Sequence, residues 1–134
     1  MPLVVVPPNF VDWAWRDGAS SLCEPCSTVE DITGDQLKLI LSRGERTLVR
    51  MDKDDKTVGW GAFRVDQLPN LRVLHITDLV SHNGEFHTFF DEIKDIAKNL
   101  GCIEVRCSCK PVQARLFKQT NGFEEVFTTL RVRL

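Results

Sequence analysis

The feature that most constrains the fold of this sequence is an alternating strand followed at once by a long amphipathic helix. Residues 71–80, LRVLHITDLV, alternate in hydrophobicity as a half-buried strand does. From Phe86 to Leu100, apolar side chains recur at the spacing of one helix face, and Gly101 is placed to end that helix. The junction between the two is a predicted helix N-terminus, where unpaired backbone amides can bind a phosphate group.

The composition describes one globular domain without a strong attraction to nucleic acid. The chain has 134 residues, 43% of them hydrophobic and 27% charged, and we expect a single domain over residues 1–134. The net charge is -2, and basic residues are interleaved with acidic ones. This charge argues against nucleic acid as a partner, because phosphate backbones attract clustered Lys and Arg.

No part of the sequence has the character of a membrane span or an export signal. No stretch approaches the roughly 18 consecutive apolar residues that a transmembrane helix needs. The first ten residues, MPLVVVPPNF, lack the basic start, long apolar run and cleavage site of a secretory signal. The cysteines are odd in number, which favours reduced thiols. We therefore expect a cytoplasmic protein with no membrane partner.

Patterns of hydrophobicity predict the remaining elements. Residues 46–65 are a predicted hairpin around the polar turn KDDK. The expected helices cover residues 9–26, 27–44, 86–100 and 111–120, and the expected strands cover residues 3–6, 46–52, 57–65, 71–80, 102–109 and 124–134. The predicted order is therefore one strand, two helices, three strands, and then helix, strand, helix and strand.

This order, together with the segment LGCIEVRCSCKPVQARLFKQTNGFEEV, resembles the GNAT superfamily of N-acetyltransferases. The most telling piece is ARLFKQTNGFEEV, which is similar to the last helix of the family and its Gly-Phe turn. The short length, the tryptophan-rich first helix and the weak motifs look most like the small, motif-degenerate GNAT-like proteins of tailed bacteriophages. That narrower resemblance implies a location in the host cytoplasm or in the virion.

The resemblance implies an α/β fold with a single GNAT-like domain. Its sheet is expected to be mixed, mostly antiparallel and twisted, with one parallel strand pair splayed apart and helices on both faces. The family uses acetyl-CoA as a cosubstrate. Here the backbone of Leu79 and Val80 would hold its pantetheine arm, and the amides of Asn83, Gly84 and Glu85 would meet its pyrophosphate.

The phosphate loop departs from the family pattern, in which small residues let the backbone approach the phosphate. Of the six loop positions only Gly84 fits, while Phe86 brings a large ring and Glu85 adds a negative charge. The alternative interpretation is a well-capped helix that binds no phosphate, with Asn83 or Ser81 as the cap. The ring of Phe86 distinguishes the two, since an inward ring leaves the phosphate position open.

Two residues are candidates for the proton transfers of an acyl transfer to an amine. Strand alternation puts Asp78 on one face with Leu74, Ile76 and Val80, where burial would raise its pKa into the range of a general base. The alternative is a solvated Asp78 at the end of its strand. The chain has no Tyr to act as the acid.

In place of that Tyr, Phe117 occupies the matching position of the last helix, and a phenyl ring cannot donate a proton. Cys109 is the candidate acid, or it is a buried core cysteine. The pairs CEPC and CSC could close a zinc site if the two segments met, but the apolar setting of CSC favours structural cysteines, and we expect no metal.

The sequence leaves two functions open. The first is a GNAT-like N-acyltransferase that uses acetyl-CoA or a related acyl-CoA and an unknown amine. The second is a catalytically inactive GNAT-fold binding or structural protein, associated with a phage and with a protein partner. Trp13 and Trp15 cannot both face one side of a helix. One of them therefore lies along the edge of its own domain or is a candidate contact in a homodimer.

Overall fold

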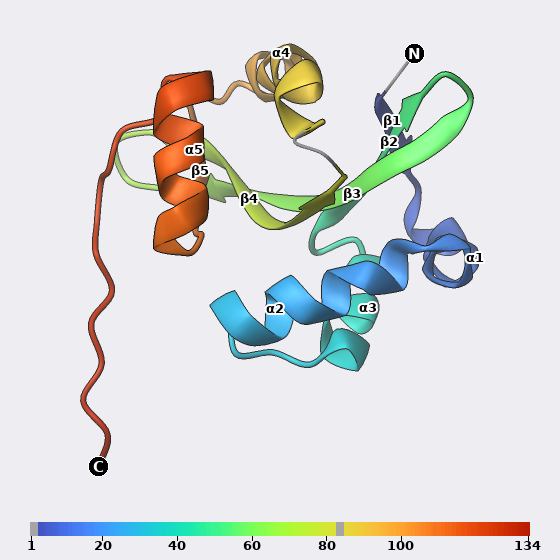
Figure 1. Ribbon diagram of the computed structural model, residues 1–134, viewed down its shortest axis with the longest axis horizontal. Coiled ribbons are helices and arrows are strands. Elements are labelled where there is room, and N and C mark those ends of the chain that lie inside the picture. The colour runs from blue at the N-terminus through green and yellow to red at the C-terminus, as the bar shows by residue number, and fades with distance from the viewer. Residues whose placement is uncertain (1–2, 83–84) are drawn as a thin grey trace.

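The computed structural model describes residues 3–82 and 85–134 and contains one five-stranded sheet with the strand order β1-β2-β3-β4-β5 (Figure 1). The strands are β1 (Leu3–Val6), β2 (Thr47–Lys53), β3 (Lys56–Gln67), β4 (Arg72–Ser81) and β5 (Glu104–Cys107). The first four strands pair antiparallel, and β4 pairs parallel with β5. The predicted fold class, a mixed α/β sheet with one parallel pair, is confirmed.

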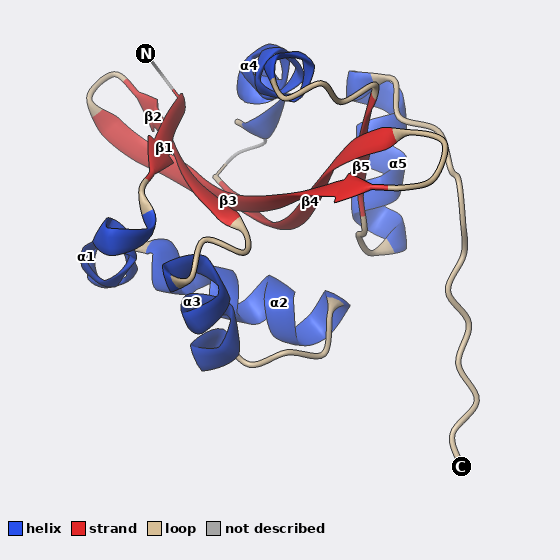
Figure 2. Ribbon diagram, turned by 180° about the vertical axis from the view of Figure 1, so that it is seen from behind, coloured by secondary structure: helices blue, strands red, loops and turns tan. Residues whose placement is uncertain are grey.

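Helices cover both faces of the sheet, as Figure 2 shows. One face carries α1 (Val11–Asp17), α2 (Cys23–Val29) and α3 (Gly34–Ser42). The other face carries α4 (Phe86–Asn99) and α5 (Pro111–Asn121). Two short 3-10 turns, Pro8–Phe10 and Ala19–Leu22, complete the first layer. Each face has its own apolar core, so the side of β4 from which a residue projects decides its neighbours.

The helix predicted over residues 9–26 is broken in two at Gly18. This glycine has a φ of 135°, a conformation that side chains rarely adopt, and it ends α1. A Cβ at Gly18 would also lie 3.1 Å from the Trp60 indole nitrogen. The chain then turns through Ala19–Leu22 before α2 begins at Cys23, so CEPC opens a separate short helix.

The predicted hairpin is confirmed, with β2 and β3 joined at Asp54 and Asp55. Both residues have positive φ values, 52° and 63°. Two successive positive φ values are typical of the two-residue turn whose twist matches that of the flanking strands. The hairpin is long, and its tip reaches the start of α4 through Lys53, which pairs with Glu85.

A β-bulge in β4 overturns the predicted face of Asp78. The pairing with β3 runs from Ile76 opposite Phe63 to Asp78 opposite Ala62, so Thr77 is an extra residue on β4. Ile76 therefore faces α4, whereas Asp78 faces the layer of α1, α2 and α3 together with Ala62. Strict alternation had placed Asp78 with Leu74 and Ile76, and one inserted residue reverses that assignment.

The last predicted strand, over residues 124–134, does not form. The chain leaves α5 at Gly122, whose φ of 72° ends the helix, and continues as an extended segment without strand pairing. Phe123 still packs against the rings of Phe90 and Phe117. Beyond it the segment runs away from the sheet (Figures 1 and 2). Alternation along a segment predicts only its tendency to pair, because a strand also requires a partner edge.

Candidate functional site

Strands β4 and β5 diverge halfway along β4. Their pairing covers only Val73 to Ile76 on β4, after which β5 ends and β4 continues to Ser81. A Cβ at Gly59 would lie 2.7 Å from the Val80 carbonyl oxygen, so that oxygen points at β3. Backbone groups of successive residues point to opposite edges of a strand, so those of Leu79 face the gap that β5 leaves.

Two adjoining cavities open at this divergence. The smaller one, of about 30 Å³, is lined by Pro25, Ile76, Thr77, Asp78, Leu79, Phe86, Cys107, Ser108, Cys109, Gln113 and Phe117. The larger one, of about 490 Å³, is lined by Glu24, Pro25, Thr28, Leu79, Val80, Ser81, Phe86, His87, Lys110, Gln113, Leu116, Phe117, Thr120 and Asn121. Leu79, Phe86 and Phe117 line both, so one continuous hollow runs from the strand gap to the start of α4.

The ring of Phe86 points inward, which is the orientation that leaves the phosphate position open. Phe86 is 4% exposed, and its ring centroid lies 5.8 Å from that of Phe90 and 5.5 Å from that of Phe117. Phe117, which stands where the resemblance implies a Tyr, is itself buried against Phe86 and Phe123. The inner wall of the hollow is therefore aromatic and carries no hydroxyl at this position.

The start of α4 is the predicted phosphate position, and two of its predicted ligands, Asn83 and Gly84, lie outside the described residues. Glu85 is described: its carboxylate lies 3.1 Å from the Lys53 ammonium, and its backbone N–H donates to the His82 carbonyl at 3.0 Å. The Lys53 charge offsets the negative charge of Glu85. The Glu85 amide is bonded within the turn.

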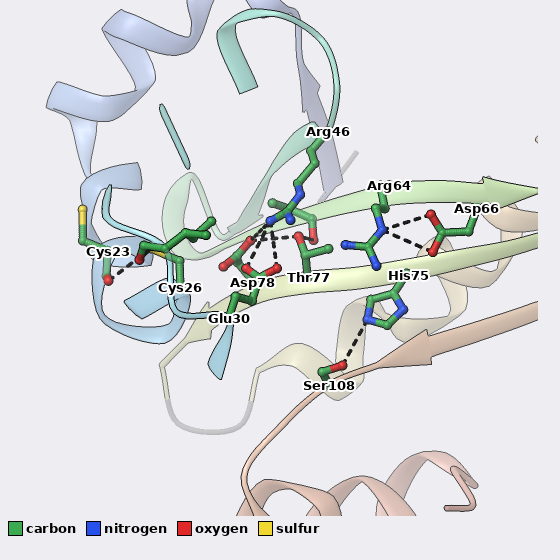
Figure 3. A network of polar contacts seen from close by, with 12 residues as sticks. Cys23, Cys26, Glu30, Arg46, Arg64, Asp66, His75, Thr77, Asp78 and Ser108 are labelled. Carbon is green, nitrogen blue, oxygen red and sulfur yellow. Dashed lines mark hydrogen bonds and ion pairs between the residues drawn. The ribbon is translucent and has the colours of Figure 1, made fainter. Parts of the chain in front are cut away.

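A buried polar network lies around Asp78 of β4, on the face of the sheet that carries α2 (Figure 3). The Arg46 guanidinium lies 3.0 Å from the Glu30 carboxylate and 3.3 Å from the Asp78 carboxylate. The Thr77 hydroxyl donates to Asp78 Oδ2 at 2.8 Å. The Asp78 side chain has no solvent exposure, and its Oδ1 atom has no hydrogen-bond partner among the described residues. Asp78 is therefore buried, not solvated at the end of its strand.

This setting raises the pKa of Asp78 to about 7. Burial is the main cause and the facing Glu30 carboxyl is the next, while the Thr77 hydrogen bond and the Arg46 charge act in the opposite direction. One guanidinium cannot fully compensate two adjacent carboxylates, so Asp78 retains its proton until the pH approaches 7. Of the two interpretations of Asp78 that the sequence left open, the structure supports the one with a raised pKa, although the neighbours that cause the rise differ from those expected.

Sequence reasoning missed Glu30 and Arg46, the two partners of Asp78. Glu30 follows the end of α2 and Arg46 immediately precedes β2, so no local spacing links either of them to residue 78. The only available signal was general: a buried carboxylate requires a charged or hydrogen-bonding partner. That rule predicts the existence of a partner but does not identify it.

The two thiols of the CSC segment line the smaller cavity. Burial raises the pKa of Cys107 to about 12 and also raises the pKa of Cys109. Both thiols are consequently protonated at neutral pH, and neither is a ready nucleophile. Among residues 3–82 and 85–134, no group of three or more His, Cys, Asp or Glu side chains is arranged to hold a metal ion.

In the described part of the chain, no helix combines the length and the apolar character needed to cross a membrane.

The Cys26 thiol donates to the backbone carbonyls of Cys23 and Ile32, at 3.2 and 3.5 Å. Cys26 is fully buried among α1, α2 and α3, and burial raises its pKa to about 11. The second cysteine of CEPC is thus a core residue.

Comparison with known proteins identifies a shared fold. No protein-family model matches the sequence, and no curated protein matches it. The structure is similar to a ribosomal-protein-alanine N-acetyltransferase from Brucella melitensis biovar Abortus 2308, with a TM-score of 0.72, 12% identity and 100% of both chains covered. It is also similar to the aminoglycoside N-acetyltransferase AAC(6')-Iy in complex with CoA, with a TM-score of 0.67, 15% identity, and 98% of this chain and 93% of that chain covered.

A third similar structure is glucosamine-6-phosphate N-acetyltransferase from Arabidopsis thaliana, with a TM-score of 0.65 and 15% identity. The match covers 98% of this chain and 96% of that chain. These proteins differ in the acceptors that their names state. At such low identity the likeness concerns the fold alone.

Proposed function

We propose that this chain, which has the GNAT acetyltransferase fold, is an N-acyltransferase that uses acetyl-CoA or a related acyl-CoA and an unidentified amine. The observation that carries the proposal is the divergence of β4 from β5, which leaves the Leu79 backbone facing a hollow that leads to the start of α4. A thin, flexible chain with an anionic end fits such a hollow, since amides can pair with its middle and a helix N-terminus attracts its phosphates.

In this proposal the backbone of Leu79 holds the pantetheine arm. Val80, the second residue expected there, lines the hollow, but its carbonyl points at β3. The pyrophosphate would lie at the N-terminus of α4, where Asn83, Gly84 and Glu85 are the proposed ligands. Asn83 and Gly84 lie outside the described residues, and the Glu85 amide would have to release the His82 carbonyl to bind it. Lys110 lines the same hollow and adds a positive charge to its wall. The inward ring of Phe86 supports this arrangement, because a ring turned outward would occupy the phosphate position.

The proton acceptor in this proposal is the carboxyl pair of Asp78 and Glu30. A base of pKa about 7 is matched to neutral pH, where it is partly deprotonated and still basic. Asp78 is fully buried, but the Glu30 side chain is 14% exposed, so a proton can reach the pair from an amine through Glu30 or a water molecule. As the amine nitrogen bonds to the acyl carbon and the C–S bond breaks, the nitrogen's proton passes to this pair.

The departing thiolate also needs a proton, and Cys109 remains the candidate donor in the chain. Its thiol lines the smaller cavity and is protonated at neutral pH, as a donor must be. The raised pKa that keeps it protonated also makes it a weak acid. Water is the other donor that this geometry permits.

One observation favours the second candidate function, a catalytically inactive GNAT-fold binding or structural protein, phage-associated and with a protein partner. Phe117 is buried where the resemblance implies a Tyr, and the thiols beside it are weak acids. A protein that had lost transfer and kept the fold would have this inner wall.

An acceptor screen separates the two functions. The protein is incubated with acetyl-CoA and a panel of amines, including peptide N-termini, lysine peptides, aminoglycosides and polyamines, and the released thiol is measured. The proposal expects enzyme-dependent thiol release with at least one amine, and the Asp78→Asn variant should reduce it. If CoA compounds bind but the panel yields no release, the inactive alternative is supported.

A further inference from the structure

Ser108 and His75 form a polar contact at the divergence of β4 and β5 that the proposed amine transfer does not use (Figure 3). The Ser108 hydroxyl oxygen lies 3.3 Å from Nε2 of the His75 ring. A hydroxyl within hydrogen-bond reach of a histidine is the arrangement of a nucleophile and its general base, and such contacts are often slightly long before a substrate binds. The two residues therefore have the geometry of an activated serine.

The strand register brings these two side chains together. Cys107 of β5 pairs with Ile76 of β4, and both pack against the apolar core on the α4 side. Successive side chains of a strand point to opposite faces of its sheet. His75 precedes Ile76 and Ser108 directly follows Cys107, so both project toward the face that carries α2.

Ser108 also lines the smaller cavity, the one at the gap between the two strands. It is exposed, whereas His75 is half-buried, so the hydroxyl is accessible and the ring is held in place. A thioester whose pantetheine arm follows the Leu79 backbone would bring its acyl carbon into this cavity. The Leu79 backbone faces the same gap, and its N–H is a donor for the oxyanion that an attack on the acyl carbon would form.

The surroundings of His75 favour a neutral ring near pH 7. The charged groups around it are Arg64 and Asp66 of β3, Arg106 opposite it on β5, and Glu30 and Arg46. Burial is the main cause that lowers the pKa of His75 below its ordinary value of 6.5, and the Arg64 charge is the next. The Asp66 and Glu30 carboxylates act in the opposite direction without reversing the shift. A neutral imidazole can accept the proton of a hydroxyl.

We propose that Ser108 and His75 transfer the acyl group of an acyl-CoA first to Ser108 and then to water, so that the chain hydrolyses acyl-CoA thioesters. The Ser108 oxygen bonds to the acyl carbon while its proton passes to His75 Nε2. The C–S bond then breaks, and His75 gives this proton to the departing sulfur. A water molecule next attacks the acyl-serine ester and gives a proton to His75, which returns it to the Ser108 oxygen as the carboxylic acid leaves.

This activity rests on the proposed function for one element, the binding of the acyl-CoA in the hollow. It requires no amine and does not use the carboxyl of Asp78. In the acceptor screen it would be measured as thiol release in the absence of any amine, so the two activities can be separated. The His75 imidazolium would also supply the proton that the weakly acidic thiols supply poorly.

The first test is amine-free thiol release by the full chain from two thioesters. One is acetyl-CoA, and the other is S-acetyl-N-acetylcysteamine, which has the end of the pantetheine arm but no nucleotide. Wild type should release thiol, and Ser108→Ala should reduce the rate by about 100-fold or more. The control is Ser42→Ala, which removes a hydroxyl on α3 that donates to the Lys38 carbonyl, and it should keep the wild-type rate.

The two thioesters distinguish failure of this inference from failure of the proposed function. Release from the small thioester without calorimetric binding of acetyl-CoA would support the serine and histidine pair and reject the CoA site. Binding of acetyl-CoA without amine-free release would overturn the inference and leave amine transfer standing. No release from either thioester, or equal release by Ser108→Ala and wild type, would also overturn it.

Three further measurements test the separate roles of the two residues. Acid-quenched protein should carry an acetyl group on Ser108 that neutral hydroxylamine leaves in place, since this reagent removes acetyl groups from cysteine. His75→Ala should slow release, and free imidazole should restore it, which a merely structural role would not allow. The wild-type rate should rise with pH to a midpoint below 6.5, because the base must be neutral. An acetyl group on Cys109 instead, or no rescue by imidazole, would contradict the inference.

Discussion

The two sides of β4 differ in the ionisable groups that they hold. On the α2 side, Asp78 and Glu30 share the Arg46 guanidinium in a buried network, and the pKa of Asp78 is raised. On the α4 and α5 side, the hollow is lined by Phe86, Phe117 and thiols whose pKa values are raised. The site therefore contains a carboxylate whose pKa suits a proton acceptor, whereas its thiols are weak proton donors. Acyl transfer to an amine would therefore depend mainly on its base.

The Asp78→Asn substitution should have the largest effect. An amide cannot accept the amine's proton, so kcat/KM for any acceptor should fall by about 100-fold to 10,000-fold. Acetyl-CoA affinity should change little, because the Asp78 side chain has no solvent exposure and its carboxylate is held by Arg46 and Thr77. Steady-state kinetics and calorimetry measure the two quantities. The control is Asp66→Asn, since that carboxylate pairs with Arg64 elsewhere on the sheet. Equal losses of kcat/KM in both variants would show that Asp78 does not accept the proton.

Removal of Arg46 should have the largest effect on stability. The Arg46→Met substitution leaves two buried carboxyls without their cation and should lower the free energy of unfolding by about 3 kcal/mol. Urea denaturation measures the change. Arg50→Met, which breaks the more exposed pair with Asp52, should cost less than about 1 kcal/mol. Similar losses in the two variants would show that the buried network contributes little.

The raised pKa of Asp78 predicts how stability depends on pH. The unfolded chain releases this proton near the ordinary pKa of 3.8, whereas the folded chain retains it until about pH 7. The folded state thus binds more protons between these values, and its stability should decrease as pH rises through them. Denaturation of wild type and Asp78→Asn across this range isolates the contribution. If the stability of wild type relative to Asp78→Asn increased as the pH rose, the result would contradict this prediction.

The smallest effect is expected beside the proposed phosphate position, where Lys53 pairs with Glu85. Lys53→Ala removes the cation that offsets Glu85 near the proposed phosphate position, so acetyl-CoA affinity should fall a few-fold, and the loss should shrink in high salt. Lys56→Ala changes the net charge equally on the same hairpin and is the matched control. Titration of both variants at two salt concentrations gives the comparison. No difference between them would place the anionic end of the ligand elsewhere.

Local sequence patterns correctly predicted those elements whose backbone conformation is specified by their own residues. The helix from Phe86 and the β2–β3 hairpin are confirmed because an apolar stripe and a two-residue polar turn each specify their own backbone. The predicted helix over residues 9–26 was wrong because Gly18 takes a conformation that ends α1. The strand over 124–134 was predicted from alternation, which does not state whether a partner edge exists.

The candidate site was predictable only in part. The sequence left two interpretations of Asp78 open, a buried base and a solvated residue at the end of its strand, and the structure agrees with the buried one. The face of Asp78 could not be predicted, because one extra residue at Thr77 reverses the alternation. Glu30 and Arg46 come from distant parts of the chain and meet Asp78 only through the packing of α2 against the sheet.

The most direct test of the central claim is calorimetric titration of the protein with acetyl-CoA, with desulfo-CoA and ADP as comparison ligands. The account predicts micromolar binding of acetyl-CoA and weaker binding of ADP, which lacks the pantetheine arm. The Gln113→Trp variant, which fills the wall shared by both cavities, should lower the affinity at least tenfold, whereas Arg115→Trp on the same helix should not. No heat from acetyl-CoA at millimolar concentration would contradict the account and leave the binding or structural role.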